Sequence, residues 1–238
     1  WTQSRSAGTY IQPNVIVSKN VIIQGAGAGS TFVQSAAAPT LSNLRVFRIL
    51  SGTVATLRGM TIRYGAGILN DGALQLEDSA LVSNTATFDG GGIYNIGRLG
   101  VRNSSIVSNT ANRGGGVYNA GVMTVTDSAI SSNRAVDSAG LHNAGVLTLT
   151  RALIAGNAAT DAGGGLYNMG GARLALRSSA LVSNSASAGG GLANAAGGLA
   201  DIGNSTIAAN VAVNSAGINN NGALTLSNST LAGNTASN

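Results

Sequence analysis

The stretch GGGVYNAGVMTVTDSAISSN, residues 114–133, is one copy of a unit that recurs along most of the chain. The same order of residues returns from Gly90 and from Gly163, and four degenerate copies align with these three. The third glycine of each copy occupies one position: Gly67, Gly92, Gly116, Gly140, Gly165, Gly191 and Gly217. Successive copies are 24–26 residues apart. A fixed period in this range predicts a solenoid of stacked coils.

Apolar residues alternate with polar ones inside each unit. Met123 to Thr126 and Leu147 to Thr150 both show a period of two, which is typical of strands, and no copy has the spacing of an amphipathic helix. Each unit contains three short apolar stretches, separated by glycine, asparagine and Asn-Ser or Asp-Ser steps that favour turns. We therefore predict an all-β fold, a single-stranded right-handed parallel β-helix with three short strands in each coil of 24–26 residues.

Stacking such coils about 4.8 Å apart places equivalent residues above one another. Three apolar columns are then expected to point inward. The first contains Ile68, Ile93, Val117, Leu141, Leu166, Leu192 and Ile218, the second Leu76, Val101, Val125, Leu149, Leu176, Ile202 and Leu226, and the third Leu81, Ile106, Ile130, Ile154, Leu181, Ile207 and Leu231. Burying each such side chain contributes roughly 1.5–3 kcal/mol, so the columns predict a sizeable core.

Two asparagine columns run through the same units at turn positions. They contain Asn70, Asn95, Asn119, Asn143, Asn168, Asn194 and Asn220, and Asn84, Asn109, Asn133, Asn157, Asn184, Asn210 and Asn234. Asparagine tolerates left-handed backbone, and stacked amides can bond to one another along the axis. We interpret both columns as structural ladders, because sevenfold repetition suits a scaffold better than a single active site.

The composition limits the classes of function. The 238-residue chain has 9% charged residues and a net charge of +5, which fits one elongated domain. The absence of cysteine excludes disulfides, a thiolate metal site and a cysteine nucleophile. No apolar run is long enough for a transmembrane helix. The arginines are spread out, without a basic stripe interleaved with aromatic residues, so we expect no nucleic-acid partner.

The two ends of the chain differ from the regular units. We predict an N-terminal entry segment and irregular first coils over residues 1–64, and seven regular coils over residues 65–238, in one continuous domain. The glycine-rich residues 25–30 favour a turn and lack the Gly-Lys-Ser/Thr of a phosphate loop. Because the chain begins at Trp1, we expect a removed signal peptide or a longer parent chain. The last coil resembles an interior coil, which predicts end-to-end association.

An enzyme with this fold would need carboxylates on neighbouring coils beside Arg, Lys or His. Asp78 and Asp127 share a column, but Asn103 lies between them. Three other acids precede the glycine step, where solvated aspartate is common: Asp89, Asp137 and Asp161. No pair matches a lyase or hydrolase dyad. We therefore predict that the chain is not an enzyme and has no catalytic residue, metal site or cofactor.

One outward column is aromatic in four successive units: Tyr94, Tyr118, His142 and Tyr167. This column is the best candidate binding surface, because aromatic ladders can stack on sugar rings, and cross-strand packing at the surface is the alternative interpretation. His142 is the only histidine of the chain. Without nearby carboxylates it is expected to be a variant of the aromatic position and not a metal ligand.

The repeated order of three glycines, an aliphatic residue and Tyr-Asn, with the lead-in RVFRI at 45–49 and LRGMTIR at 57–63, carries a family resemblance. It resembles right-handed parallel β-helix repeat proteins of bacterial surfaces, similar to polymorphic outer-membrane-protein and autotransporter-passenger adhesins. The resemblance covers roughly residues 15–238. The double-glycine part of the family pattern matches, whereas its FxxN motif is absent. The resemblance implies this fold and surface display, and little about activity.

These observations lead to one expected function and one alternative. We expect a non-catalytic extracellular structural or adhesive β-helix at the cell surface, associating end to end. Its expected partners are other copies of itself, other cell-surface components and glycans, with no nucleic acid and no membrane span. The alternative is a carbohydrate-active β-helix enzyme, similar to polysaccharide lyases or hydrolases, or a carbohydrate-binding remnant of one. Turnover of pectin- or alginate-like polymers would discriminate between the two.

Overall fold

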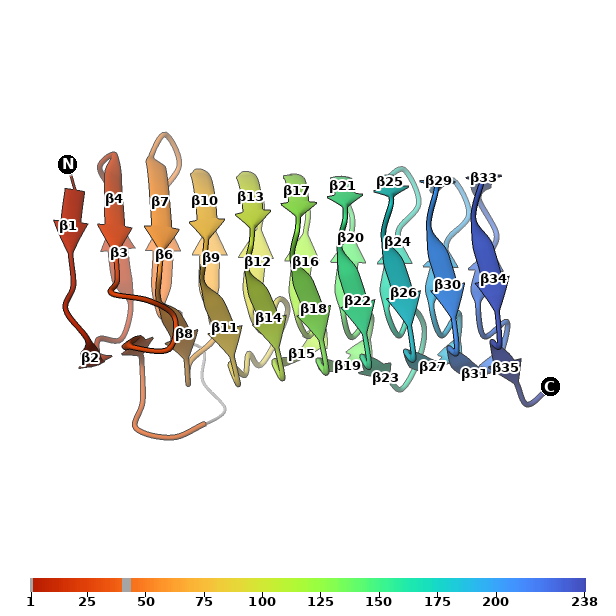
Figure 1. Ribbon diagram of the computed structural model, residues 1–238, viewed down its shortest axis with the longest axis horizontal. Helices are drawn as coiled ribbons and strands as arrows, with labels where there is room; N and C mark the ends of the chain where they lie inside the picture. The colour runs from red at the N-terminus through yellow and green to blue at the C-terminus, as the bar shows by residue number, and fades with distance from the viewer. Residues whose placement is uncertain (1, 40–43) are drawn as a thin grey trace.

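A computed structural model describes residues 2–39 and 44–238 and shows about ten coils stacked along one axis (Figure 1). Each coil adds one strand to each of three sheets, and every strand pair in the described chain is parallel, as in Ile93↔Val117. The described residues contain strands and turns and no helix. The predicted parallel β-helix with three strands per coil is confirmed. Trp1, which was assigned to the entry segment, lies outside the described residues.

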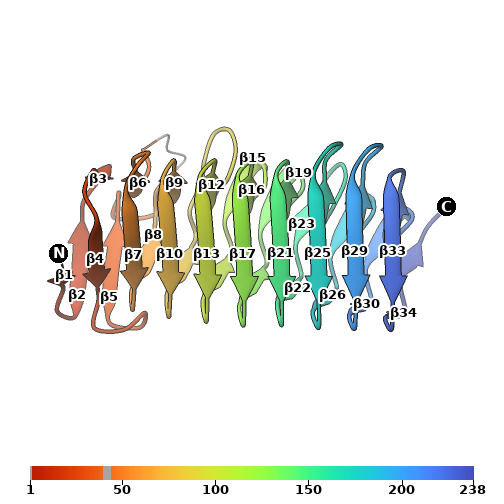
Figure 2. The same cartoon turned by 90° about the horizontal axis from the view of Figure 1, so that it is seen from above.

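Sheet A is ten-stranded, contains the longest strands and faces the viewer in Figure 2. Its strands, in order, are β1 (Thr2–Ser4), β4 (Val21–Gln24), β7 (Val54–Arg58), β10 (Ala73–Glu77), β13 (Arg98–Arg102), β17 (Val122–Thr126), β21 (Val146–Thr150), β25 (Arg173–Arg177), β29 (Leu199–Gly203) and β33 (Ala223–Ser227). In the middle strands, such as β13 and β17, alternate residues are buried, because one face covers the core and the other faces solvent.

Sheets B and C complete each coil. The strands of sheet B are β2 (Gly8–Ile11), β5 (Thr31–Gln34), β8 (Thr61–Arg63), β11 (Ala80–Val82), β14 (Ser105–Val107), β18 (Ala129–Ser131), β22 (Leu153–Ala155), β26 (Ala180–Val182), β30 (Thr206–Ala208) and β34 (Thr230–Ala232). The strands of sheet C are β3 (Val15–Val17), β6 (Phe47–Ile49), β9 (Ile68–Asn70), β12 (Ile93–Asn95), β16 (Val117–Asn119), β20 (Leu141–Asn143), β24 (Leu166–Asn168), β28 (Leu192–Asn194) and β32 (Ile218–Asn220).

A fourth, short sheet was not expected from the sequence. It contains β15 (Thr110–Arg113), β19 (Arg134–Asp137), β23 (Ala158–Ala159), β27 (Ser185–Ala188), β31 (Val211–Asn214) and β35 (Thr235–Ala236). These segments lie between sheets B and C in the later coils, and few of their residues are buried and apolar. They pair because stacking brings equivalent loops into register, which their own hydrophobic pattern does not reveal.

The three apolar columns fill the interior as predicted. Their residues pair in register across successive coils, and those from Ile68 to Ile207 are almost completely buried. In the last described coil the same columns are more open, with Leu226 and Leu231 42% and 47% exposed. No described segment forms a helix long and apolar enough to cross a membrane.

Both predicted asparagine ladders are present. In the first, the Nδ2 of each asparagine donates to the Oδ1 of the next at 2.7–2.8 Å, as between Asn95 and Asn119. In the second, the Oδ1 of each asparagine accepts both Nδ2 and the backbone N–H of the preceding one, as Asn133 does from Asn109. Except for Asn220 and Asn234 in the last coil, these side chains are buried within the stack. Each ladder therefore pairs polar groups whose burial would otherwise be costly.

The structure contains a third polar ladder, made of serines, that the sequence did not lead us to expect. Serines at the start of sheet B occupy one column, which contains Ser79, Ser104, Ser128, Ser179, Ser205 and Ser229 and is interrupted by Ala152. The Oγ of Ser104 donates to the carbonyl of Arg102 and accepts the backbone N–H of Ser79, at 2.8 and 3.1 Å. The Ser in each Asn-Ser or Asp-Ser step was a signal for this ladder, although it was interpreted only as part of a turn.

Candidate functional site

The aromatic column predicted from the sequence forms a continuous stack of rings on sheet C. Tyr94 of β12, Tyr118 of β16, His142 of β20 and Tyr167 of β24 follow one another with centroids 5.1, 4.8 and 5.1 Å apart. The planes of neighbouring rings differ by only 6–13°. The stack arises because the parallel register repeats one outward position in every coil.

The middle of this stack is covered and not open to solvent. Tyr118 is 9% exposed and His142 only 3% exposed, and both faces of each ring contact a neighbouring ring. Sugar rings stack on the faces of aromatic side chains, so neither middle ring offers a free platform. The expectation of an open outward column is corrected for these two residues. Ligand binding by the exposed parts of Tyr94 and Tyr167 stays a prediction.

The two ends of the stack are closed differently. At Tyr94, the guanidinium of Arg45 lies 5.8 Å from the ring centroid and donates to the backbone oxygens of Ala66, Gly90 and Asp89 at 2.5, 2.7 and 2.9 Å. Burial lowers the pKa of Arg45 to about 10. Beyond Tyr167 the column continues with a small residue, Ala193, so the ring stack ends there.

A line of charges runs beside the rings. Arg113 forms a two-pronged ion pair with Asp89, at 3.0 and 2.7 Å, and its guanidinium lies 5.2 Å from the ring centroid of Tyr118. Arg113 also pairs in register with Asp137 on the neighbouring strand β19. Asp89 and Asp137 were expected to be solvated loop acids. That expectation is wrong for both, because the short sheet and its preceding loop draw them against the ring stack.

His142 is held within this cluster as a neutral ring. Its Nδ1 hydrogen-bonds the Oγ of Ser138 at 2.9 Å and lies 3.8 Å from a carboxylate oxygen of Asp137. The expectation that His142 lacks a nearby carboxylate is therefore wrong. Burial lowers the pKa of His142 to about 4, and the charge of Arg113 acts in the same direction. Burial also raises the pKa of Asp137.

The chemistry open to this cluster is limited by its burial. The Nε2 of His142 is buried and has no hydrogen-bond partner among the described residues, and the ring is stacked on both faces, so it is not accessible to a substrate from solvent. Within the described ranges, no group of three or more His, Cys, Asp or Glu residues is placed to hold a metal ion. The contacts of this cluster connect neighbouring coils, and its polar groups are not open to a ligand.

A more accessible feature lies on the outward face of sheet A, in β13. Arg98, Gly100 and Arg102 point to the same side of this strand because side chains alternate, and both arginines are exposed. A depression of about 360 Å³ lies around Gly100. The register places Gln75 of β10 on one side of Gly100 and Thr124 of β17 on the other.

Gly100 lies on the floor of this depression. The end of the Gln75 side chain occupies the space that a Cβ at Gly100 would take. Thr124 and Thr126 add hydroxyl groups on the far side. The ion pair of Arg102 with a carboxylate is long, with its Nε 4.0 Å from Glu77 Oε1. The arrangement gathers hydrogen-bond donors around a shallow surface with little neutralising charge.

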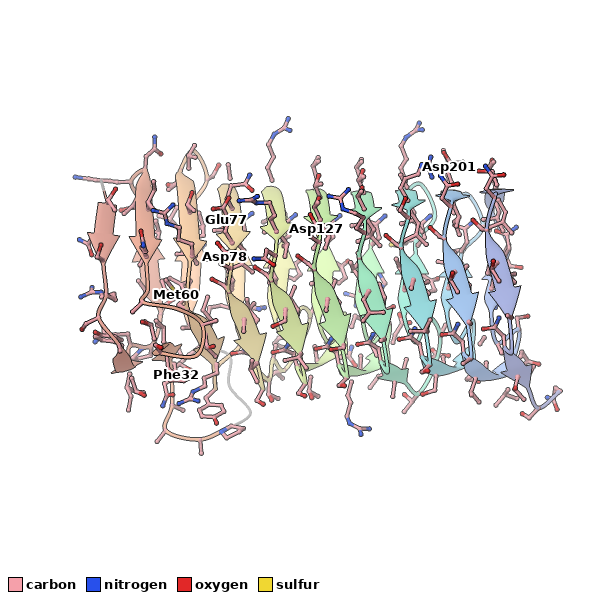
Figure 3. The ribbon with its side chains drawn as sticks, in the orientation of Figure 1. Phe32, Met60, Glu77, Asp78, Asp127 and Asp201 are labelled. Atoms are coloured by element: carbon pink, nitrogen blue, oxygen red, sulfur yellow. The ribbon has the colours of Figure 1, made fainter. Side chains whose placement is uncertain are left out.

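Sheet A as a whole carries more positive than negative charge on its outward face. The arginines are Arg58, Arg98, Arg102, Arg173 and Arg177, and the acids are Glu77 and Asp201. Figure 3 labels both acids near this sheet. Arg177 is paired with Asp201, and Arg58 donates to Gln24, whereas Arg98 has no ion pair with any residue described by the structure. These arginines do not recur in every coil, so the repeat pattern of the sequence does not reveal the site.

Comparisons with known proteins assign this chain to no family. No protein-family model matches the chain, and no curated protein matches it. Among solved structures, the chain is similar to the A-module of the mannuronan C-5 epimerase AlgE4 of Azotobacter vinelandii. The identity is 15% and the TM-score 0.42, over 98% of this chain and 87% of that module.

This match requires one correction. The prediction that the chain is not an enzyme is contradicted, because the matched module belongs to a carbohydrate-active enzyme, and we withdraw that prediction. We transfer no activity and no residue role from so distant a likeness. The β-solenoid rests on the parallel register of the strands themselves. The comparisons give no support to the narrower resemblance to polymorphic outer-membrane-protein or autotransporter adhesins.

Proposed function

We propose that the chain binds an acidic polysaccharide across the outward face of sheet A. The observation that carries this proposal is the depression around Gly100, between the exposed guanidinium groups of Arg98 and Arg102. Guanidinium groups match carboxylate and sulfate oxygens in geometry and charge. The donors around Gly100 therefore suit an anionic group carried on a hydroxyl-rich chain.

The surrounding surface favours a polymer over a small ion. Sheet A continues on both sides of β13, and its outward residues recur at each coil, about 4.8 Å apart. The threonines of β17 and β21 offer hydroxyl groups along the same face. The strands β7, β10, β13 and β17 contain no aromatic residue, so this face lacks the platforms on which nucleic-acid bases stack. A polyuronate or a sulfated glycan fits these features best.

Binding is tested with alginate and polygalacturonate as acidic polymers and dextran as a neutral one, by affinity electrophoresis. We expect the wild-type chain to be retarded by the acidic polymers, and less so as the salt concentration rises, because screening weakens contacts between exposed charges. The double variant Arg98→Gln/Arg102→Gln is expected to lose most of this retardation.

The matched control removes the same charge elsewhere. Arg134 is exposed on the short sheet and Arg5 lies near the N-terminus, so Arg134→Gln/Arg5→Gln changes the net charge equally. This control is expected to keep most of the binding. Equal losses in both double variants would mean that net charge alone attracts the polymers, and the proposed site would be wrong.

The same polymers also test catalysis. Unsaturated uronate ends, reducing ends and the uronate composition of recovered polymer are measured after long incubation. A change that the wild-type chain produces and Arg98→Gln/Arg102→Gln does not would make the sheet A face a carbohydrate-active site. End-to-end association, surface location and other cell-surface partners are separate proposals, which sedimentation and cell fractionation test.

A further inference from the structure

A second hollow runs along the corner where each coil turns from sheet A to sheet B. It has a volume of about 530 Å³, and we call it the corner trough. Its rim consists of the corner residues of four successive coils: Asp78, Asn103, Asp127 and Arg151. All four have φ between 47° and 51°, so their side chains leave the corner in the same direction. Figure 3 labels Asp78 and Asp127 along this line.

The floor of the corner trough is made of small side chains. The first position of β11, β14 and β18 faces outward there and is occupied by Ala80, Ser105 and Ala129. In β22 the same position is occupied by Leu153, which is 43% exposed. This larger side chain, together with Arg151, ends the trough on its C-terminal side.

The opposite end is closed by the glycine-rich loop. Residues 25–30 connect β4 to β5, and Figure 1 shows this loop reaching along the axis toward β8. The backbone N–H of Gly27 donates to Gly59 at 2.9 Å, and the hydroxyl of Thr61 donates to the carbonyl of Ala28 at 2.5 Å. The loop therefore covers the third coil's corner, and Ala28 becomes the end wall.

The closed ends set the length of any ligand. Four rim residues at a spacing of about 4.8 Å span about 14 Å from the first to the last. That length accommodates roughly three linked sugar rings lying along the axis. A long polymer would have to leave the trough over the loop or over Leu153, so the shape favours a short chain.

The polar atoms of the trough select the chemistry of the ligand. The hydroxyls of Ser79, Ser104 and Ser128 are committed to backbone partners within the serine ladder. Asn103 donates to one oxygen of Asp78, and the other carboxylate oxygen and the amide oxygen of Asn103 accept no hydrogen bond from the described residues. These two groups are acceptors, and the hydroxyl of Ser105 on the floor can both donate and accept, so the hydroxyl groups of a sugar suit them.

The charge of the trough excludes the ligands suited to sheet A. Arg151 binds both oxygens of Asp127, at 2.6 and 2.8 Å, and this contact lowers the pKa of Asp127. Asp78 has no arginine partner among the residues that the structure describes. The rim therefore carries two carboxylates and one guanidinium, which is already paired, and the charge of Arg102 also acts on Asp127. The rim offers no free guanidinium to an anionic group.

We infer that the corner trough is a binding site for a short neutral oligosaccharide of about three sugar units. It is distinct from the proposed acidic-polymer surface on sheet A, where Arg98 has no ion pair with any described residue. The test fills the trough without touching the core. Ala129→Leu places in β18 the side chain that β22 already carries in register at Leu153, so the backbone tolerates it.

The matched control is Ala180→Leu, the same substitution in the same column on the other side of Leu153. Both alanines are partly buried at the start of their strands. Maltotriose, cellotriose and chitotriose are titrated at millimolar concentration, with binding followed by calorimetry and by NMR line broadening of the sugar. We expect at least one to bind wild type and Ala180→Leu alike, and Ala129→Leu about tenfold more weakly.

Several outcomes would overturn the inference. The first is failure of all three trisaccharides to bind wild type, and the second is an equal loss of affinity in the two leucine variants. Spermidine is titrated in the same way as a cationic probe, and the third outcome is that only spermidine binding is weakened by Ala129→Leu. The last outcome would make the trough a site for cationic ligands. Arg98→Gln/Arg102→Gln is expected to leave trisaccharide binding unchanged, so failure of the sheet A proposal and failure of this one can be told apart.

Discussion

Tyr118 lies flat against His142, with ring centroids 4.8 Å apart and planes inclined by 6°. In the two neighbouring tyrosine coils the residue four positions before the ring is a glycine with positive φ, Gly114 or Gly163, whereas His142 is preceded by Ser138 at φ 60°. A Cβ at Gly163 would lie 2.8 Å from the Cβ of Tyr167. In the coil of His142 a serine therefore replaces this glycine, next to the smaller imidazole ring, and the serine hydroxyl hydrogen-bonds the Nδ1 of that ring.

The burial of His142 predicts that acid weakens the fold. Its pKa is about 4 in the folded chain and 6.5 in the absence of structure. Between these pH values the unfolded chain binds a proton that the folded chain does not, so stability falls as the pH decreases from about 6.5 to about 4. The full loss from this group is about 3 kcal/mol. The raised pKa of Asp137 acts in the opposite direction at the acid end of this window.

Denaturant unfolding at several pH values measures this effect. The reference is His142→Tyr/Ser138→Gly, which copies the ring and turn of the neighbouring coils and removes the titrating group. Wild type is expected to lose stability relative to this variant on acidification through the window. Parallel pH profiles for the two proteins would show that His142 titrates normally, and the structural account of its burial would fail.

The gap in the serine ladder predicts a stabilising substitution. Ala152 is 3% exposed and occupies the column position between Ser128 and Ser179. Its own backbone N–H already donates to the Oγ of Ser179 at 2.9 Å. In Ala152→Ser the new hydroxyl can accept the backbone N–H of Ser128 and donate to the carbonyl of Thr150, as its neighbours do. We expect a gain of about 1 kcal/mol in the free energy of unfolding.

The reverse change supplies the comparison. Ser128→Ala removes a hydroxyl that donates to Thr126 and accepts from Ser104, and it should destabilise the chain by about 1–3 kcal/mol because buried groups lose their partners. Both variants are measured by denaturant unfolding. A destabilising Ala152→Ser would mean that the backbone of this coil has closed over the missing hydroxyl.

The sequence was sufficient for the features that repeat. The glycine step, the apolar columns and the asparagine ladders recur seven times, and a one-residue shift would turn every apolar column outward, so register followed directly from the period. The ring stack on sheet C followed in the same way. The short sheet and the surroundings of His142 could not be predicted, because they depend on loops between the strands. The short sheet has no apolar alternation, yet it buries His142 and brings Asp137 to it.

The candidate binding surfaces could not be predicted from the sequence, because their residues do not repeat from coil to coil. Arg98, Gly100 and Leu153 each depart from the residues above and below them, and a search for repeats treats such departures as noise. Their effect appears only when neighbouring coils are stacked, because the register places Gly100 between Gln75 and Thr124 in the lining of the sheet A depression. In a solenoid, repeated residues build the scaffold, and the exceptions distinguish one part of the surface from another.

The second asparagine ladder predicts a strong dependence of stability on position. In Asn133, Oδ1 accepts the backbone N–H and the side-chain amide of Asn109 at 2.9 and 3.0 Å, and Nδ2 donates to Ile106 and Asn157 at 3.0 Å each. Asn133→Ala removes all four contacts and leaves buried donors and acceptors unpaired. Because each unpaired group costs about 1–3 kcal/mol, we expect the free energy of unfolding to fall by at least about 3 kcal/mol.

Asn234→Ala is the matched substitution in the same ladder. Asn234 also accepts two hydrogen bonds from the preceding asparagine, Asn210, but it is only partly buried, so water can replace its side chain. Its loss is expected to cost about 1 kcal/mol. Hydrogen exchange would show where each change acts, with Asn133→Ala exposing amides on both sides of the middle coils and Asn234→Ala affecting the last coil alone. If the two variants were equally stable, the ladder would contribute through its turn conformation and not through its buried hydrogen bonds.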